Sequence, residues 1–241
     1  MPATIMDLAV SSNVVYNLYR TRGSTPATQG HQTAPNGYQT VLAWEAIEAG
    51  FLGAIYERPN DSTLVVALRG TVANEGQEGR MVGGQNLKTD VALWAVEGAP
   101  ASLPHVDTII AQAREIGGGK SILLTGHSLG GALAVIAGVS HGLPACVFNA
   151  PSVHKMLRGG MIHGPTVNVT ADSLDRAENA IINFNMAFDP VSKSSRAVGK
   201  VVKLPRDGFN LFGQHSQDRV INALRKTNWG ARTFDQALQA A

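Results

Sequence analysis

The sequence predicts an α/β fold with a mostly parallel central sheet flanked by helices. Along its 241 residues, short apolar runs of strand length alternate with longer segments whose apolar residues recur at helical spacing. Glycine and proline cluster between these segments, as is typical of turns. Several of the short runs are apolar throughout, which indicates strands covered by helices on both faces. We therefore expect one α/β domain over residues 1–241.

Composition and charge narrow the classes of protein that fit this chain. With 44% hydrophobic and 16% charged residues, the chain is able to bury one sizeable core. The formal net charge is only +2, and Lys and Arg are scattered among the acidic residues, so we expect no nucleic-acid partner. The lone cysteine, Cys146, lies in an apolar run and is predicted to be a buried structural thiol. The seven histidines show no H-E-x-x-H pattern, so we expect no metal and no cofactor.

The N-terminal segment and the length of the apolar runs indicate where the protein is located. The N-terminal 20 residues lack both a charged n-region and an adequate apolar h-region, so we expect no Sec signal. No run approaches the roughly 20 apolar residues that cross a bilayer. These observations predict a soluble protein that is cytoplasmic, or one that is exported by a non-Sec route as a bacterial effector would be.

The N-terminal part of the chain is expected to form a helix and then strands. Apolar spacing predicts a helix over 7–19 with Asp7 as its N-cap. Strands are expected within 37–50 and within 51–69, where a turn at 58–62 interrupts the apolar runs. The polar, glycine-rich segment 72–90 is predicted to be a surface loop.

The rest of the chain continues the alternation of helix and strand. A helix over 106–116 should end at Gly117, and a second helix should begin at Leu129 and end at Gly142. Polar helical spacing at 171–178 indicates a solvated helix. The remaining predicted elements are strands at 121–125, 145–151, 180–190 and 200–205 and a late helix at 218–227.

The stretch "LLTGHSLGG" combines a strand, a sharp turn and a helix. Such a turn forces Ser128 into a strained backbone conformation and requires glycine at Gly126 and Gly130, where side chains would collide with neighbouring elements. It would present the serine hydroxyl at the C-terminal edge of the sheet, beside a helix N-terminus. This arrangement suits a nucleophile. The alternative is an ordinary turn in which Ser128 caps the helix.

A nucleophilic serine on this scaffold needs an acid and then a histidine, in that chain order. His215 is the one histidine that follows the last buried strand able to supply the acid. Asp189 comes directly after the apolar run 181–188, at the C-terminal end of a strand, where catalytic groups gather in α/β sheets. Asp207 is the reserve candidate, although a turn also explains it. Taken alone, His215 fits a surface loop residue better than a catalytic base.

An oxyanion hole is the fourth requirement of this chemistry. The N–H of Leu129, the residue after the serine, is one candidate donor. Thr71, in the "RGT" that follows the strand at 64–68, is the candidate for the second donor. An ordinary turn is the alternative explanation for "RGT".

Six segments in this order carry a resemblance to a known family: "LVVALRGT", "TDVALW", "ILLTGHSLGGALAVIAG", "ACVFNAPSV", "NFNMAFDPVSK" and "GQHS". Together they resemble the class 3 lipases, the fungal-type triacylglycerol lipase family of α/β-hydrolases. The resemblance implies the α/β-hydrolase fold, with Ser128 as nucleophile, Asp189 as acid and His215 as base. It also implies an oxyanion hole at Thr71 and Leu129.

The same resemblance places a lid within residues 72–98, near 91–96. A lid there would shield the site in water and open on a membrane or other lipid surface. The alternative for 91–96 is a buried helix that does not move.

The sequence therefore predicts a serine carboxylic ester hydrolase of lipid esters, of the triacylglycerol lipase or phospholipase A type. Short-chain or feruloyl esterases, thioesterases and acyltransferases of the same fold remain alternatives, as does a non-catalytic module that binds a lipid or a protein partner. Nucleotide binding at "GGGKS" is excluded, because a phosphate-binding loop would need glycine at Arg114 and would follow a strand.

Overall fold

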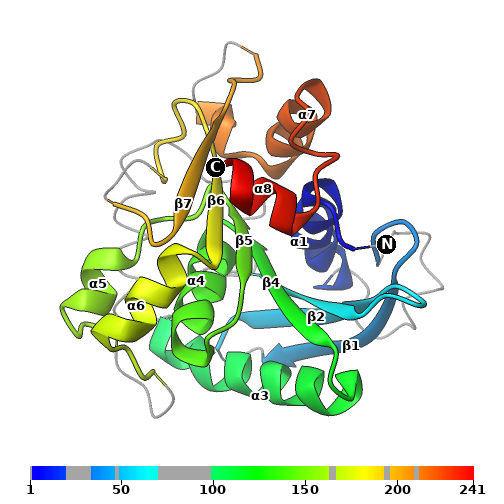
Figure 1. The fold of residues 1–241 in the computed structure, drawn as a ribbon, viewed down its shortest axis with the longest axis vertical. Helices are drawn as coiled ribbons and strands as arrows, with labels where there is room; N and C mark the ends of the chain where they lie inside the picture. Colours follow the sequence, from blue (N-terminus) through cyan, green and yellow to red (C-terminus); the bar gives the residue numbers. More distant parts are fainter. Residues whose placement is uncertain are drawn as a thin grey trace.

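A seven-stranded sheet forms the centre of the described part of the chain (Figure 1). The computed structural model describes residues 2–19, 34–46, 49–69, 99–162, 167–192, 196–208 and 212–241. The strands lie in chain order across the sheet. They are β1 (Gln39–Ala46), β2 (Phe51–Glu57), β3 (Thr63–Arg69), β4 (Ser121–His127), β5 (Ala145–Phe148), β6 (Ile181–Met186) and β7 (Lys200–Leu204).

The pairing of the strands confirms a mostly parallel sheet. β1 pairs antiparallel with β2, and β2 pairs antiparallel with β3. From β3 to β7 every pairing is parallel. The carboxyl ends of β4, β5 and β6 therefore open onto one edge of the sheet, which is the edge where ligand and catalytic groups gather in such folds.

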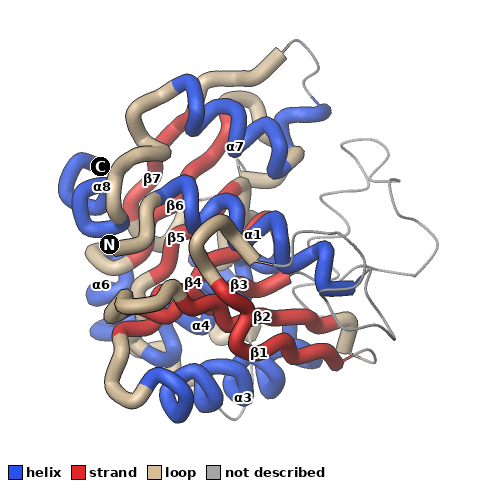
Figure 2. The backbone as a smooth tube through the Cα atoms, turned by 90° about the vertical axis from the view of Figure 1, so that its right-hand side faces the viewer, coloured by secondary structure: helices blue, strands red, loops and turns tan. Residues whose placement is uncertain are grey.

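Helices cover both faces of the sheet (Figure 2). The helices that connect consecutive parallel strands share one face, as right-handed crossovers require. The helices at the two ends of the chain, α1, α7 and α8, pack on the opposite face. The helices are α1 (Ile5–Tyr19), α3 (Ala99–Gly117), α4 (Leu129–His141), α5 (His154–Arg158), α6 (Ala171–Glu178), α7 (Gln217–Lys226) and α8 (Phe234–Ala240).

The sheet separates two apolar clusters, and the strands β2 to β6 each contribute to both. In β3, Leu64, Val66 and Leu68 pack with α3 and α4, while Val65 and Ala67 pack on the side of α1 and α7. All five side chains are fully buried. This two-sided burial explains why the strand is apolar throughout and lacks the alternation of a half-exposed strand.

Two helix starts differ from the sequence-based prediction. α1 begins at Ile5, where Thr4 and Asp7 form a reciprocal capping box: Thr4 N–H donates to Asp7 Oδ2 (2.9 Å) and Asp7 N–H donates to Thr4 Oγ1 (3.2 Å). The assignment of Asp7 as the N-cap was therefore wrong, since Thr4 occupies that position. α3 begins at Ala99, seven residues before the predicted start, and it includes Pro104.

The other predicted helices and strands between 121 and 227 are present, with ends shifted by a few residues. α4 ends as expected at Gly142, whose φ of 65° is the left-handed conformation of a helix C-cap. Cys146 is fully buried, and this burial raises the pKa of its thiol well above the usual range. Within the described residues, no helix combines the length and the apolar character needed to cross a membrane.

Candidate active site

A strained turn between β4 and α4 presents Ser128. Ser128 has φ 56° and ψ −128°, a conformation that costs free energy in a residue other than glycine. A Cβ on Gly126 would lie 2.4 Å from the backbone carbonyl carbon of Gly130, and one on Gly131 would lie 2.8 Å from Ala150 Cβ. Strand and helix can therefore approach this closely only because glycine occupies these positions, as expected for Gly126.

Neighbouring backbone groups hold the turn in place. The N–H of Ser128 donates to the carbonyl of Phe148 at the end of β5 (3.0 Å), and the carbonyl of Ser128 accepts from the N–H of Ala132 (3.1 Å). The Ser128 side chain makes no capping hydrogen bond to α4. The alternative in which its hydroxyl caps the helix is therefore wrong, and the hydroxyl is directed elsewhere.

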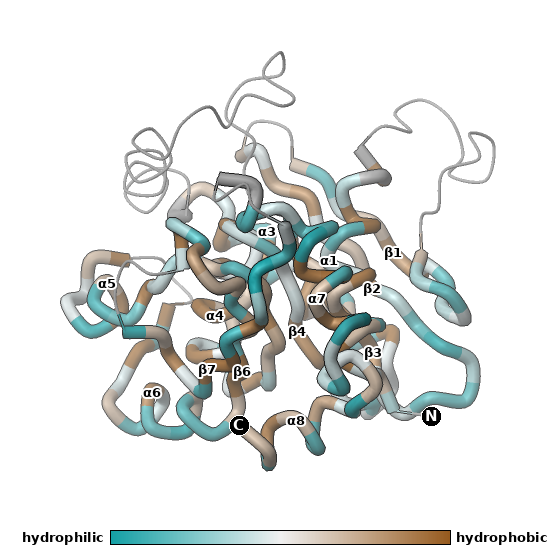
Figure 3. Tube along the Cα trace, turned by 90° about the horizontal axis from the view of Figure 1, so that it is seen from above, coloured by the Kyte–Doolittle hydropathy of each residue, from teal (hydrophilic) through white to brown (hydrophobic). Residues whose placement is uncertain are grey.

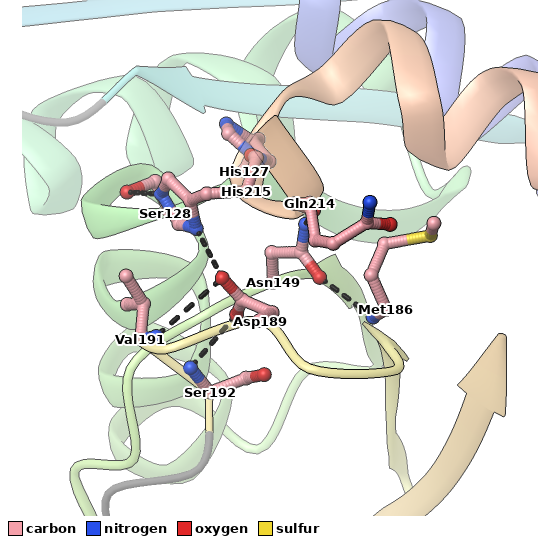
Figure 4. A network of polar contacts seen from close by, with 9 residues as sticks. All are labelled: His127, Ser128, Asn149, Met186, Asp189, Val191, Ser192, Gln214 and His215. Atoms are coloured by element: carbon pink, nitrogen blue, oxygen red, sulfur yellow. Dashed lines mark hydrogen bonds and ion pairs between the residues drawn. The ribbon is translucent and has the colours of Figure 1, made fainter. Parts of the chain in front are cut away.

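Ser128, His215 and Asp189 form one chain of hydrogen bonds (Figure 4). His215 Nε2 lies 2.7 Å from Ser128 Oγ, and His215 Nδ1 lies 2.9 Å from Asp189 Oδ1. The exposed fractions are 4% for Ser128, 7% for His215 and 0% for Asp189, so solvent competes little for these bonds. The structure thus brings together the serine, the acid and the histidine that the sequence analysis selected as candidates.

The surroundings of Asp189 favour its ionised form. Burial alone would raise the pKa of this carboxyl, but the hydrogen bond and charge of His215 and the hydrogen bonds from Ser192 outweigh burial and lower it. The N–H groups of Ser192 (2.8 Å) and Val191 (3.4 Å) also donate to the carboxylate. Because an ionised carboxylate only accepts, His215 carries its proton on Nδ1, and the lone pair of Nε2 faces the Ser128 hydroxyl.

Asp207, the reserve acid, is engaged in other contacts. Its carboxylate accepts from Lys226 Nζ (2.5 Å) and from Asn222 Nδ2 (3.3 Å), both on α7. The hydrogen bond from Lys226 is the main reason that the pKa of Asp207 is lowered. Its backbone N–H and C=O pair with the side-chain amide of Gln214 (3.0 and 3.1 Å). Asp207 therefore organises the segment before His215 and does not orient the His215 ring.

The structure describes one of the two predicted oxyanion donors, Leu129. Leu129 is the first residue of α4. The N–H groups of the first helical turn have no acceptor within the helix, so the N–H of Leu129 needs an acceptor from elsewhere. Thr71 lies outside the described residues, and so does the proposed lid at 72–98 with its segment 91–96.

Sequence reasoning missed two buried residues at this edge of the sheet, His127 and Asn149. His127 Nε2 lies 2.7 Å from the backbone oxygen of His215. Asn149 Nδ2 donates to the backbone oxygen of Gln214 (2.9 Å), and Asn149 Oδ1 accepts from Met186 N–H (2.8 Å). The signal that pointed to Asp189 also applies to Asn149, since both follow the carboxyl end of a buried parallel strand.

Across the described ranges, no three His, Cys, Asp or Glu side chains lie close enough together to hold a metal ion. The polar groups of the site instead bond to one another and to the backbone.

Comparison with known proteins agrees with the fold. The architecture is the α/β-hydrolase fold, with a mostly parallel sheet and helices on both faces. Residues 8–196 match the Tle-like phospholipase domain of the phospholipase-like family. The chain therefore belongs to this family, among lipase-like and phospholipase-like proteins, in agreement with its resemblance to the fungal-type lipases.

The individual relatives described next have low sequence identity to this chain. The ATG15 lipase sequence of Eremothecium gossypii is 23% identical over 226 residues, which cover 78% of this chain and only 39% of that protein. The structure of Lip2 lipase from Yarrowia lipolytica aligns at a TM-score of 0.50 and 14% identity, over 84% of this chain and 77% of Lip2. A triacylglycerol lipase with a serine protease triad as its catalytic centre aligns at 0.51 and 14%, over 86% and 83%.

Proposed function

We propose that this chain is a serine hydrolase that cleaves the carboxylic esters of lipids. One observation carries the proposal: a serine on a strained strand-to-helix turn is hydrogen-bonded to a buried histidine, which is hydrogen-bonded to a buried carboxylate. A serine hydroxyl is a weak nucleophile unless an adjacent base takes its proton, and this arrangement supplies such a base. The triad described for the triacylglycerol lipase of the same fold supports this assignment.

The first half of the reaction acylates Ser128. As Ser128 Oγ attacks the ester carbonyl carbon, its proton passes to His215 Nε2. Asp189 holds the Nδ1–H tautomer of His215 and stabilises the imidazolium that forms. The tetrahedral intermediate then collapses: the bond between carbon and the alcohol oxygen breaks, and His215 Nε2 returns the proton to the leaving alcohol.

The second half of the reaction removes the acyl group. Water attacks the acyl carbon while His215 Nε2 takes one of its protons. Collapse then breaks the bond between the acyl carbon and Ser128 Oγ, His215 Nε2 returns the proton to this oxygen, and the carboxylic acid leaves. In both halves the carbonyl oxygen gains negative charge. We assign its stabilisation to the Leu129 N–H at the start of α4, together with Thr71. The positive end of the α4 dipole adds to the same effect.

Phospholipids are the substrate class that we propose first. The family match to a phospholipase domain supports this choice, with triacylglycerol esters as the second class. An enzyme for either class meets its substrate at a lipid surface. We propose that the segment 72–98 provides the contact with that surface.

Replacement of Ser128 tests the proposed function. We expect Ser128→Ala to abolish labelling by a fluorophosphonate probe and to lower turnover on the order of 10⁶-fold, as in a measured serine hydrolase. Turnover is measured on phospholipid vesicles, triacylglycerol emulsions and p-nitrophenyl esters, with and without detergent.

Ser140→Ala is the matched control, because Ser140 lies near the far end of α4 and its Oγ has no hydrogen-bond partner within the described residues. We expect it to retain labelling and turnover. Equal turnover by the parent and Ser128→Ala would rule out the proposed mechanism. A folded parent that is neither labelled nor active would instead indicate a non-catalytic binding module.

A further inference from the structure

Both peptide groups that flank the Cα of His215 are held by side chains from other strands. The carbonyl before this Cα belongs to Gln214 and accepts from Asn149 Nδ2 (2.9 Å). The carbonyl after it belongs to His215 itself and lies 2.7 Å from His127 Nε2. Each peptide group is planar, so the two groups can rotate only about the φ and ψ bonds of His215. Holding both groups therefore restricts φ and ψ, and with them the direction of the bond from Cα to the side chain.

His127 acts as a permanent donor in this arrangement. A backbone carbonyl only accepts, so the proton must reside on His127 Nε2. His127 is the last residue of β4, is 8% exposed and lies against the His215 ring, with 4.9 Å between ring centroids and 38° between ring planes. Burial, followed by the nearby His215, lowers the pKa of His127 to about 3. The ring is therefore neutral at the pH at which His215 acts as a base.

Asn149 connects the 3-10 helix Phe212–His215, which carries the proposed base, to β6, which leads to the proposed acid. Its side chain is fully buried, and its backbone adopts the left-handed region with φ 46°. The amide orientation is determined by its partners, because Met186 N–H needs the oxygen and the Gln214 carbonyl needs the nitrogen. Met186 ends β6, three residues before Asp189, so one amide group connects the two segments that carry His215 and Asp189 (Figure 4).

We propose that His127 and Asn149 are positioning residues that direct the imidazole of His215, so that Nε2 reaches Ser128 while Nδ1 stays on Asp189. This inference rests on the proposed function of the same site. One donor is the last residue of β4 and the other directly follows β5, so both belong to the central sheet. They hold the carbonyls of the last two residues of the 3-10 helix Phe212–His215, which carries the ring. The orientation of the base matters because even a 1 Å misplacement of a reacting group can cost about 10²-fold in rate.

Three variants test the proposal. His127→Phe removes the donor but keeps an aromatic ring, and His127→Gln restores a side-chain N–H near the position of Nε2. Asn149→Gly removes the amide and tolerates the positive φ without added strain. We expect His127→Phe and Asn149→Gly to lower kcat per labelled active site by about 10- to 100-fold with little change in KM, and we expect His127→Gln to recover most of the loss.

Asn183→Ala is the matched control for a purely structural effect. Asn183 is also a buried asparagine, and its Nδ2 donates to the backbone oxygens of Val198 (2.7 Å) and Lys200 (3.1 Å), away from His215. We expect this variant to lower the melting temperature while kcat per labelled site stays the same. Normalising turnover to fluorophosphonate-labelled sites separates a loss of folded protein from a loss of alignment.

Proton NMR of the His215 Nδ1–H provides a readout that needs no substrate. In the parent this proton lies between Nδ1 and the Asp189 carboxylate and should give a resonance far downfield. We expect the resonance to weaken or broaden in His127→Phe and Asn149→Gly and to persist in Asn183→Ala.

The outcomes separate failure of this inference from failure of the proposed function. Unchanged kcat per site and an unchanged resonance in a folded His127→Phe or Asn149→Gly variant would overturn the positioning role and leave the serine hydrolase intact. A parent that is not labelled and has no turnover would overturn the function itself. Since both variants report the same quantities, either one decides the question if the other fails to fold.

Discussion

At the scale of single residues, the tautomer of His215 depends on the groups that its two ring nitrogens contact. Asp189 is an acceptor on one side and Ser128 is a hydroxyl donor on the other, at 2.9 and 2.7 Å. Only the Nδ1–H tautomer satisfies both contacts. In the proposed mechanism, Asp189 selects this tautomer and stabilises the imidazolium that forms during the reaction.

Asp189→Asn tests this role with almost no change in shape. An amide at this position can donate to Nδ1 and so favours the tautomer that has its proton on Nε2, which cannot accept from Ser128. We expect kcat to fall on the order of 10⁴-fold, as in a serine protease with the equivalent change, while the fold is kept. The measurement is kcat on the best ester found for the parent.

Asp207→Asn is the control for the loss of a carboxylate in this region. Its partners are Lys226 and Asn222, and its side chain makes no hydrogen bond to the His215 ring within the described residues. We expect this variant to retain kcat. A larger loss from Asp207→Asn than from Asp189→Asn would contradict the assignment of the acid.

At the scale of elements, the site depends on how closely β4 and α4 approach each other. The backbones of Gly126 and Gly130 are so near that a Cβ on Gly126 would lie 2.4 Å from a backbone atom. A backbone atom cannot move aside as the end of a flexible side chain can. The close approach of strand and helix beside Ser128 therefore requires that Gly126 and Gly131 carry no side chain.

Gly126→Ala should consequently disturb both stability and the site. We expect it to lower the free energy of unfolding by about 1–3 kcal/mol, as overpacking does, and to lower the rate of fluorophosphonate labelling. Denaturant unfolding and labelling kinetics measure the two effects. Gly118→Ala is the control, because nothing lies within 4 Å of its added Cβ and only its positive φ of 54° opposes the change. Equal labelling rates in Gly126→Ala and the parent would argue against the close approach.

At the scale of the whole molecule, the polar site lies between two apolar clusters that the sheet separates. In Figure 3, brown hydrophobic stretches gather on the strands in the middle of the molecule, and teal hydrophilic stretches lie mainly toward the periphery. His127 is buried in the folded state, and unfolding would expose it to water. Protonation of His127 is therefore coupled to unfolding. The neighbouring groups are the ring of His215 and, through its charge, Asp189.

The stability of the whole molecule should therefore decrease in acid partly because of His127. Its folded pKa of about 3 lies below the ordinary 6.5, so the unfolded state binds the proton first as the pH falls. The stabilising contribution is complete above about pH 6.5 and is lost progressively toward about pH 3. We expect the melting temperature of the parent to drop more than that of His127→Gln between about pH 7 and about pH 4. Parallel pH curves for the two proteins would contradict this.

The order and type of most elements could be predicted from the sequence, because they depend on local signals. The apolar runs at 64–68 and 121–125, the Gly142 C-cap and the turn around Ser128 are each encoded within a few residues. The same holds for the candidates Ser128 and Asp189, since the ends of parallel strands are recognisable from their apolar runs. His215 was predicted differently, from the chain order in which a histidine follows the acid. The start of α3 was missed because the apolar spacing that predicts this helix begins only at Val106.

Other features depend on contacts between distant parts of the chain, and these only the tertiary structure decided. Asp189 and His215 are separated by 26 residues, and His127 and His215 by 88 residues. Whether Asp207 faces His215 or Lys226 depends on the packing of α7. Whether Asn149 donates to Gln214 depends on where the 3-10 helix that contains Gln214 lies at the edge of the sheet. The sequence by itself determined which residues could act and on which strand ends they stand. Tertiary packing decided which of them meet, because a hydrogen bond requires two groups within about 3 Å, and local signals do not specify that distance across the fold.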